Sequence, residues 1–488
     1  MTLQELTGAI PGGRVLPSGA PATAIAEVVH RADLAGPGAL FCCLTGGARD
    51  GHDFAPQAAA RGAAALMVER PLDLPLPQAL VPDTRLGMAL AAAALAGHPS
   101  ERLTVVGVTG TNGKTTSAFL LRAILEAAGL RSGLVGTVET IVGGVPVPAI
   151  HTTPDPPELQ DLFRRMLAAG DAACAMEVSS HALAQRRVAG VRFAAALFTN
   201  LTRDHLDYHA DVEEYFAAKR LLFARPPHHG ADPPAAVNLD DAFGRRLAQE
   251  TGALGYALER PADVAPEWVR PLPRGVAMRL RTPRGPLELE SRLRGRFNVA
   301  NLAGVVAVGE LLGLDHAAVA AGIAGVPGVP GRFEPVESDR PFQVLVDYAH
   351  TPDSLENILR AARDLAGEGR LWVVFGCGGD RDRGKRPLMG AIARALADVA
   401  VVTSDNPRTE DPEAIIGEIV AGAGVGEAVL TVEPDRRRAI ELAVEGARAG
   451  DVVVIAGKGH EVGQERDGVV TPFDDREVAR AALAGAPA

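Results

Sequence analysis

The stretch "VVGVTGTNGKTT" (residues 105–116) joins an apolar run, a glycine-containing loop and the start of a helical pattern. Its β-branched apolar residues predict a strand buried on both faces. Gly110 and Gly113 lack a Cβ, so the backbone can come close to an anion there. Residues 114–130 have helical spacing, and a helix N-terminus presents free N–H groups to a phosphate. The stretch therefore predicts a phosphate-binding loop between a strand and a helix.

The spacing of this loop is unusual. In the common P-loop a glycine stands six residues before the lysine, and here that position is Val108. GTPases and motor ATPases normally keep that glycine, so its absence disfavours these two classes of nucleotide-binding protein. Lys114 is expected to reach the β- and γ-phosphates, and the Thr115 hydroxyl to hold Mg²⁺. A plain glycine turn is the alternative, but a Gly-Lys-Thr sequence at such a junction disfavours it.

The composition sets outer limits. A chain of 488 residues is expected to form two to four domains. A net charge of −11 argues against a nucleic-acid partner held by bulk charge. The four cysteines show no paired or metal-ligand spacing, which favours a reducing compartment. The first residues lack the features of a signal peptide, and no apolar run is long enough to cross a bilayer. We expect a cytoplasmic monomer without membrane insertion.

Strand-like and helix-like segments alternate along the chain, which predicts an α/β protein with parallel sheets. Breaker-rich joints divide it into blocks at residues 1–100, 101–328 and 329–488. In the first block "GALFCCL" and "AAALMVE" predict strands and "DFAPQAAARG" a helix. Residues 260–290 predict an antiparallel edge or insertion, and residues 325–336 a turn-rich linker. Polar loops follow the predicted strands, and ligands of open α/β sheets bind at such loops.

Four further residues have side chains suited to a metal site. Glu177 follows a predicted strand, where a carboxylate can hold Mg²⁺; a surface glutamate is the alternative. His205 and His209 are four residues apart and could form a zinc pair on a helix, yet no third ligand is evident. Lys219 has the pattern of an ordinary helix lysine. Reaction with CO₂ would make it an anionic carbamate that offers oxygens to a hard cation.

Eleven motifs occur in order along the chain, and together they resemble the Mur ligases, ATP-dependent amide-forming enzymes of peptidoglycan synthesis. They are "TGTNGKTT", "HTTPDPPEL", "MEVSSHAL", "TNLTRDHLDYH", "YFAAKRLLF", "GRFNVANLAG", "VPGRFEPV", "VDYAHTPDSLENIL", "GCGGDRDRGKRPLMG", "SDNPRTEDP" and "GKGHE". Within that family the chain resembles the ligase that adds the third residue to UDP-N-acetylmuramoyl-L-alanyl-D-glutamate. The likeness covers nearly all of the second and third blocks.

The resemblance implies a UDP-substrate domain (1–100), a central ATP-binding domain (101–328) and a Rossmann-like amino-acid-binding domain (329–488). It implies ATP and Mg²⁺ as cofactors, with catalytic and metal roles for Lys114, Thr115, Glu177, His205 and a carbamoylated Lys219. The nucleotide positions are Gly110, Thr111, Asn112, Gly113, Lys114, Thr115, Thr116, Asn298, Asn301 and Arg332. The muramyl-dipeptide positions are Thr152, Thr153, Ser179, Gln185 and Arg187. The incoming amino acid matches Arg381, Asp405, Asn406, Pro407, Arg408, Gly457 and Glu461, and residues 347–350 match the loop that enters the third domain.

The resemblance also implies which amine is added. "DNPR" goes with meso-diaminopimelate, and the Arg408 fork suits the second carboxylate of that molecule. The alternative is that Arg408 pairs with Glu410 or Asp411 on a surface loop. In the first block many relatives carry "DSR" where this chain has "RAD", so the usual uridine-contacting serine is Ala32. Two rival functions are a folylpolyglutamate synthase of the same superfamily and a nucleotide switch without ligase chemistry.

Overall fold

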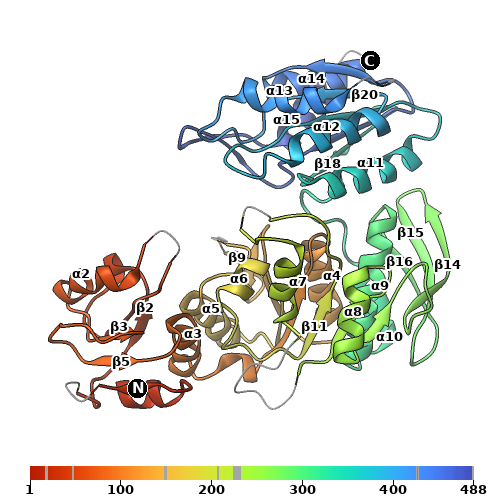
Figure 1. Ribbon diagram of the computed structural model, residues 1–488. Coiled ribbons are helices and arrows are strands. Elements are labelled where there is room, and N and C mark those ends of the chain that lie inside the picture. Colours follow the sequence, from red (N-terminus) through yellow and green to blue (C-terminus); the bar gives the residue numbers. More distant parts are fainter. Residues whose placement is uncertain are drawn as a thin grey trace.

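The computed structural model describes residues 1–16, 20–46, 49–147, 151–205, 208–223, 232–424, 426 and 428–485. Three bodies follow one another in Figure 1, from the red N-terminal body through the central body to the blue C-terminal body above it. Each is built on its own sheet, and strands alternate with helices through the chain. The predicted α/β class is confirmed. Among the described residues no helix is both long and apolar enough to cross a membrane.

The N-terminal body contains a five-stranded sheet in the order β1-β5-β4-β3-β2. Its elements are α1 (Leu3–Gly8), β1 (Arg14–Val15), β2 (Glu27–Val29), η1 (Ala32–Leu34), β3 (Ala39–Cys42), η2 (Gly51–Phe54), α2 (Ala55–Ala60), β4 (Ala65–Val68), β5 (Gln78–Leu80), α3 (Thr84–Leu95) and η3 (Pro99–Glu101). Both predicted strands and the predicted helix are present. Helix α3 packs closely on the central body, because a Cβ on Gly190 would lie 2.6 Å from the Ala89 carbonyl oxygen.

The central body contains an eight-stranded sheet in the order β13-β12-β11-β6-β10-β7-β8-β9. Its first elements are β6 (Thr104–Thr109), α4 (Lys114–Ala127), β7 (Ser132–Val135), β8 (Thr140–Val142), β9 (Val145–Val147), α5 (Pro156–Ala168), β10 (Ala173–Glu177), α6 (Ser180–Ala184), β11 (Ala195–Phe198), α7 (Val212–Arg220), β12 (Ala235–Asn238), α8 (Ala242–Thr251) and β13 (Leu254–Tyr256). Strands β6, β10 and β11 are parallel neighbours, so the loops after them lie at one edge of the sheet.

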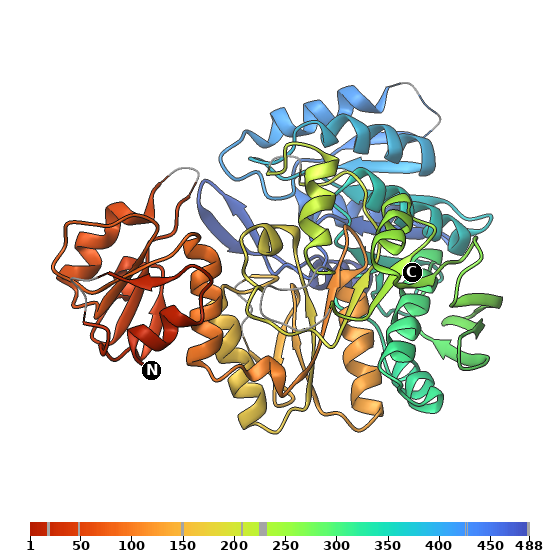
Figure 2. The ribbon, with the colours of Figure 1, turned by 60° about the horizontal axis from the view of Figure 1, so that its bottom comes forward.

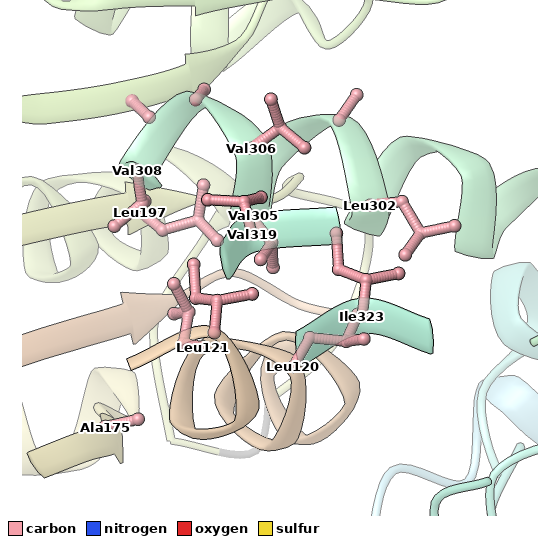
Figure 3. Close-up of a cluster of buried hydrophobic side chains, with 14 of the residues drawn as sticks. Leu120, Leu121, Ala175, Leu197, Leu302, Val305, Val306, Val308, Val319 and Ile323 are labelled. Carbon is pink, nitrogen blue, oxygen red and sulfur yellow. The ribbon is translucent and has the colours of Figure 1, made fainter. Parts of the chain in front are cut away.

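A second part of the central body follows the large sheet. Strands β14 (Ala265–Leu272), β15 (Gly275–Arg281) and β16 (Leu287–Ser291) form an antiparallel sheet of their own, and helices α9 (Arg296–Leu311) and α10 (His316–Ala324) follow. The segment predicted as an antiparallel edge or insertion is therefore a separate insertion. Figure 3 shows how α9 and α10 cover α4 and the sheet, with Leu120 and Leu121 facing the valines of α9 and α10. This buried apolar layer fixes the helix that follows the phosphate loop.

The C-terminal body contains a six-stranded sheet in the order β17-β18-β22-β19-β20-β21. Its elements are β17 (Glu334–Pro335), β18 (Gln343–Asp347), α11 (Pro352–Ala366), β19 (Leu371–Phe375), α12 (Lys385–Leu396), β20 (Val399–Val402), α13 (Pro412–Ala423), β21 (Val429–Val432), α14 (Arg436–Gly446), β22 (Val452–Ala456), β23 (Gly463–Arg466), β24 (Val469–Pro472) and α15 (Asp475–Gly485). All pairs but β17–β18 are parallel. Helices α11 to α13 cover one face of this sheet, and α14 and α15 cover the other. Loops at the carboxyl ends of the parallel strands are where ligands of such sheets bind. Figure 2 shows this blue body above the central body.

Candidate active site

The phosphate loop is shaped by two glycines with positive φ. Gly110 has φ +151° and Gly113 has φ +87°, and a Cβ on either would collide with Thr199 Oγ1 or Asn301 Oδ1 respectively. The loop therefore requires glycine at both positions. Lys114, the first residue of α4, donates from Nζ to the carbonyl oxygens of Gly110 (3.0 Å) and Thr111 (2.8 Å). Its ammonium lies over the loop, where a phosphate chain would bind.

Glu177 is the centre of a buried polar network beside the loop. The prediction placed Glu177 directly after the strand, whereas it is the last residue of β10. Its side chain is 1% exposed, so the alternative of a surface glutamate is wrong. Its Oε2 accepts from Thr115 Oγ1 (3.0 Å), and its Oε1 accepts from the Thr137 backbone N–H (2.8 Å). Arg332 donates from Nη2 to the same Thr115 hydroxyl (2.9 Å). A carboxylate, a hydroxyl and a guanidinium are thus held together at the start of α4.

Lys219 lies on α7 but is not an ordinary helix lysine. Its side chain is 1% exposed, and Nζ donates to the Gly110 carbonyl (2.7 Å) and lies 4.4 Å from the centroid of the Tyr215 ring. Burial lowers the pKa of this amine well below its usual value, and the nearby Lys114 ammonium lowers it further. The lowered pKa favours the neutral form of the amine, which is the nucleophilic one.

The histidines do not form the helical pair that their spacing allowed. His205 has φ +55° in a loop before α7, and residues 206–207 between the two lie outside the described part. Burial lowers the pKa of His205 to about 4, so its ring is neutral at pH 7 and can ligate a cation. His209 is buried, and its Nε2 lies 3.0 Å from Ser180 Oγ. The structure places His205, and not His209, on the cavity that contains Glu177 and Lys219.

A cavity of about 540 Å³ brings together most of the predicted nucleotide and dipeptide residues. Its lining includes Thr111, Asn112, Gly113, Lys114, Thr115, Thr116, Thr152, Thr153, Glu177, Ser179, Gln185, Arg187, His205, Lys219, Asn301 and Arg332. Gly110 is not in the lining, but its carbonyl oxygen accepts from both lysines. Asn298 lies behind Asn301 and accepts from its Nδ2 (3.1 Å), so it supports the lining from outside.

A second cavity, of about 440 Å³, contains the predicted amino-acid residues. Arg381, Asp405, Asn406, Arg408, Gly457 and Glu461 line it, whereas Pro407 does not. Gly457 has φ +115°, and a Cβ there would lie 2.6 Å from Asp405 Oδ2. Five residues line both cavities: His181, Asp204, His205, Tyr348 and His350. The two cavities therefore adjoin, and a group in one can react with a group in the other.

Arg408 is held by the hairpin of β23 and β24. Its φ is +52°, its N–H donates to the Glu465 carbonyl (3.1 Å), and its carbonyl accepts from the Asp467 N–H (2.7 Å). The guanidinium lies 3.3 Å from Glu465 Oε2 and donates to the Gly379 carbonyl (2.7 Å). The alternative in which Arg408 pairs with Glu410 or Asp411 is wrong, since Arg408 pairs with Glu465 and Glu410 pairs with Arg386. The fork is pre-oriented at the cavity wall.

A buried ion pair supports this loop from behind, and the sequence reading missed it. Arg436 and Asp475 are both fully buried and 2.7 Å apart, and Arg436 also donates to the carbonyl oxygens of Ala456 (2.9 Å) and Ser404 (3.4 Å). Those two carbonyls lie at the ends of β22 and β20, directly before the Gly457 and Asp405 loops. No local motif distinguishes Arg436 from the arginines beside it.

Comparison with known proteins agrees with this geometry. Residues 25–107, 108–309 and 331–459 match the models described as "Mur ligase family, catalytic domain", "Mur ligase middle domain" and "Mur ligase, glutamate ligase domain". The chain is 46% identical over 488 residues to the UDP-N-acetylmuramoyl-L-alanyl-D-glutamate--2,6-diaminopimelate ligase of Geobacillus thermodenitrificans, covering 99% of each chain.

Two solved structures extend the comparison. A structure named for the same ligase matches with a TM-score of 0.70 and 34% identity over 99% of both chains. The folylpolyglutamate synthase of Mycobacterium tuberculosis, solved with ADP and AMPPCP, has a TM-score of 0.64 at 21% identity, covers 83% of this chain and 96% of its own, and shares the fold alone. With matched domain models and a full-length relative at 46% identity, the chain belongs to the Mur ligase family.

Proposed function

We propose that this protein is an ATP-dependent ligase that adds meso-2,6-diaminopimelate to the D-glutamate of UDP-N-acetylmuramoyl-L-alanyl-D-glutamate, a step in peptidoglycan precursor synthesis. The observation that carries the proposal is the pair of adjoining cavities. One contains a phosphate loop, and the other contains an arginine fork beside acidic and amide oxygens. The name of the 46% identical relative supports the same reaction.

The reaction activates an acid with phosphate. The γ-phosphoryl group of ATP moves to the D-glutamate side-chain carboxylate, and ADP leaves. The amine then attacks the acyl phosphate, and phosphate leaves from the tetrahedral intermediate with loss of a proton. Phosphoryl transfer needs positioning and neutralisation of charge more than covalent help. Lys114 and Arg332, both on the first cavity, would supply the positive charge.

The residues around Glu177 fit a magnesium ion. Thr115, Glu177, His205 and Lys219 as its carbamate would hold Mg²⁺, which when bound would neutralise the two anions that must meet. Within the described residues no three His, Cys, Asp or Glu side chains are grouped closely enough to hold a metal. The carbamate oxygens of Lys219 and the Thr115 hydroxyl would supply the further ligands that a metal ion needs. The lowered pKa of Lys219 favours carbamate formation, because the unprotonated nitrogen is the form that attacks CO₂, with release of one proton.

We also propose the division of labour among the domains. Residues 1–100 would hold the uridine nucleotide, residues 101–328 ATP, and residues 329–488 the amino acid. The joint at residues 325–331 would act as the hinge that closes the third domain and excludes water from the acyl phosphate. We propose a cytoplasmic monomer for the complete enzyme.

The test is phosphate release by the purified protein with ATP, Mg²⁺, the UDP-linked dipeptide and one candidate amino acid at a time. We expect release that needs both the dipeptide and meso-diaminopimelate, and none in Lys114→Ala, whose missing charge acts at the γ-phosphate. Release with a folate and glutamate would favour the synthase, and hydrolysis independent of both substrates would favour the switch. Near-normal turnover of Lys114→Ala would refute the role of the loop.

A further inference from the structure

The chain contains 45 arginines but four lysines, and all four lie at the two cavities. Lys114 and Lys219 line the first cavity, and Lys385 lines the second. Lys458 lies directly behind the second, with Nζ 3.0 Å from Oε2 of its lining residue Glu461. Basic positions elsewhere in the chain are all arginine. These four positions therefore differ from every other lysine-or-arginine position of the chain in carrying an ammonium, which differs from a guanidinium in geometry and hydration.

No role has yet been assigned to Lys385 or Lys458, and of the two Lys458 is the fully buried one. Its side chain is 0% exposed. Nζ donates to Asn406 Oδ1 (2.9 Å) and Glu461 Oε2 (3.0 Å) and lies 3.8 Å from Asp405 Oδ1. Two of these oxygens accept hydrogen bonds from Nζ, and the third lies within ion-pair distance. Such a cluster around a single nitrogen suits an ammonium, whereas a planar guanidinium needs acceptors in its own plane. All three oxygens belong to residues that line the amino-acid cavity.

The position of Lys458 decides which way the Asn406 amide faces. Asn406 Oδ1 accepts from both Lys458 Nζ and the Glu465 backbone N–H (3.0 Å). Because both donors point at the oxygen, the amide nitrogen is turned the other way and donates to Glu461 Oε2 (2.9 Å). Without the ammonium, one of the two contacts that fix this orientation is lost.

Lys458 also sets the charge of the cavity wall. Asp405 and Glu461 carry two negative charges, and the ammonium between them offsets one. One negative charge is then left to attract a ligand ammonium, while Arg381 and Arg408, which line the same cavity, place positive charge where a ligand carboxylate would bind. Such a wall matches a distal end that carries both groups. Two uncompensated carboxylates would instead favour a distal end that is an ammonium alone.

We propose that Lys458 is a positioning residue that determines specificity: as an internal counter-ion of Asp405 and Glu461, it makes the cavity prefer meso-diaminopimelate over L-lysine. This inference rests on the proposed function. It assigns discrimination to a buried cation behind the cavity, in addition to the arginine fork that faces it.

The experiment measures kcat/KM for meso-diaminopimelate and for L-lysine in the wild type and in Lys458→Met, Lys458→Gln and Lys458→Arg. In both neutral variants we expect the ratio of the two constants to fall by about tenfold or more, since a charge-assisted contact of this kind commonly contributes that much. Lys458→Arg keeps the charge but not the geometry, so it should keep most of the ratio with a higher KM for diaminopimelate. Heat-unfolding scans establish that each variant is folded.

The matched control is Arg466→Met, which removes one exposed positive charge from β23, outside the residues that line the cavity. It should leave the ratio unchanged. A uniform loss for both amino acids in the Lys458 variants, an equal change of ratio in the control, or failure of both neutral variants to fold would overturn the inference. Wild-type enzyme that does not use diaminopimelate would refute the proposed function instead, which is a different result.

Discussion

Arg332 donates from Nη2 to Thr115 Oγ1 across 2.9 Å, although 217 residues separate them in the sequence. Asn112 of the same loop donates from Nδ2 to Asp353 Oδ2 (2.8 Å), at the start of α11. The phosphate loop of the central body is therefore completed by side chains that enter with the third domain. Under the proposed closure, movement of that domain would also assemble the phosphate site.

Lys219→Ala should lower the ligation rate by about 100-fold or more, because charge stabilisation at a transferring phosphoryl group contributes at least that much. Acetate should restore part of the activity by replacing the lost carbamate oxygens. Wild-type protein supplied with ¹³C-bicarbonate should show a carbamate carbon signal that Lys219→Ala lacks. A bare amine in metal-bound, active enzyme would refute the carbamate.

Arg408→Ala should lose about 2–3 kcal/mol of transition-state binding for meso-diaminopimelate, because the variant loses the charge-assisted pair between the guanidinium and the second carboxylate of the ligand. The measurement is kcat/KM for diaminopimelate against L-lysine. Arg466→Ala is the control: its side chain is exposed and 3.8 Å from Asp467. Unchanged selectivity in Arg408→Ala would show that the fork does not read the carboxylate.

Arg436→Met should destabilise the third domain by about 3–5 kcal/mol, because it leaves Asp475 buried without its partner. The double variant Arg436→Met/Asp475→Leu should recover much of the loss. Hydrogen exchange of amides in β20 and β22 reports the local free energy of opening. Equal protection in the single variant and the wild type would contradict a supporting role.

Asp347 gives a pH-dependent stability. Burial raises its pKa to about 6, although the Phe333 and Ala349 N–H groups donate to it. Between pH 4 and 6 the folded state holds the proton and the unfolded state has lost it, so stability falls as pH rises. Relative to Asp347→Asn, the wild type should lose up to about 3 kcal/mol between pH 4 and 7. Denaturant unfolding across that range checks it; parallel profiles would refute it.

Local pattern was enough for the strands that are buried on both faces and for the loops that follow them. Strands β3, β4, β6 and β10 were all predicted, because a continuous apolar run is a strong signal. The short strands β1, β2, β5 and β21 and the antiparallel β8 and β9 were not predicted, since two to four residues carry little periodicity and their pairing depends on distant neighbours.

The site residues that could be predicted are likewise those defined by their neighbours in the sequence. The phosphate loop and Glu177 follow from sequence because each is defined by residues beside it. His205 and His209 lie before α7 and not on a helix: His205 has a left-handed backbone, although the His209 N–H still donates to its carbonyl oxygen (3.0 Å). Arg436 and Lys458 were not predicted, because the hydrogen bonds that define their roles join them to residues 20 and 52 positions away in the sequence.

Because lysine is rare in this chain, amine-modifying reagents have few side-chain sites to react with. Reagents that modify primary amines find four side-chain targets in the whole chain, and each one adjoins a cavity. Lys114 and Lys385 are partly exposed, one on each cavity, whereas Lys219 and Lys458 are buried. Slow acylation at the first pair therefore reports whether a nucleotide or an amino acid is bound, and acylation at the second pair reports opening of the protein. A labelling map by mass spectrometry would follow catalysis without any engineered probe.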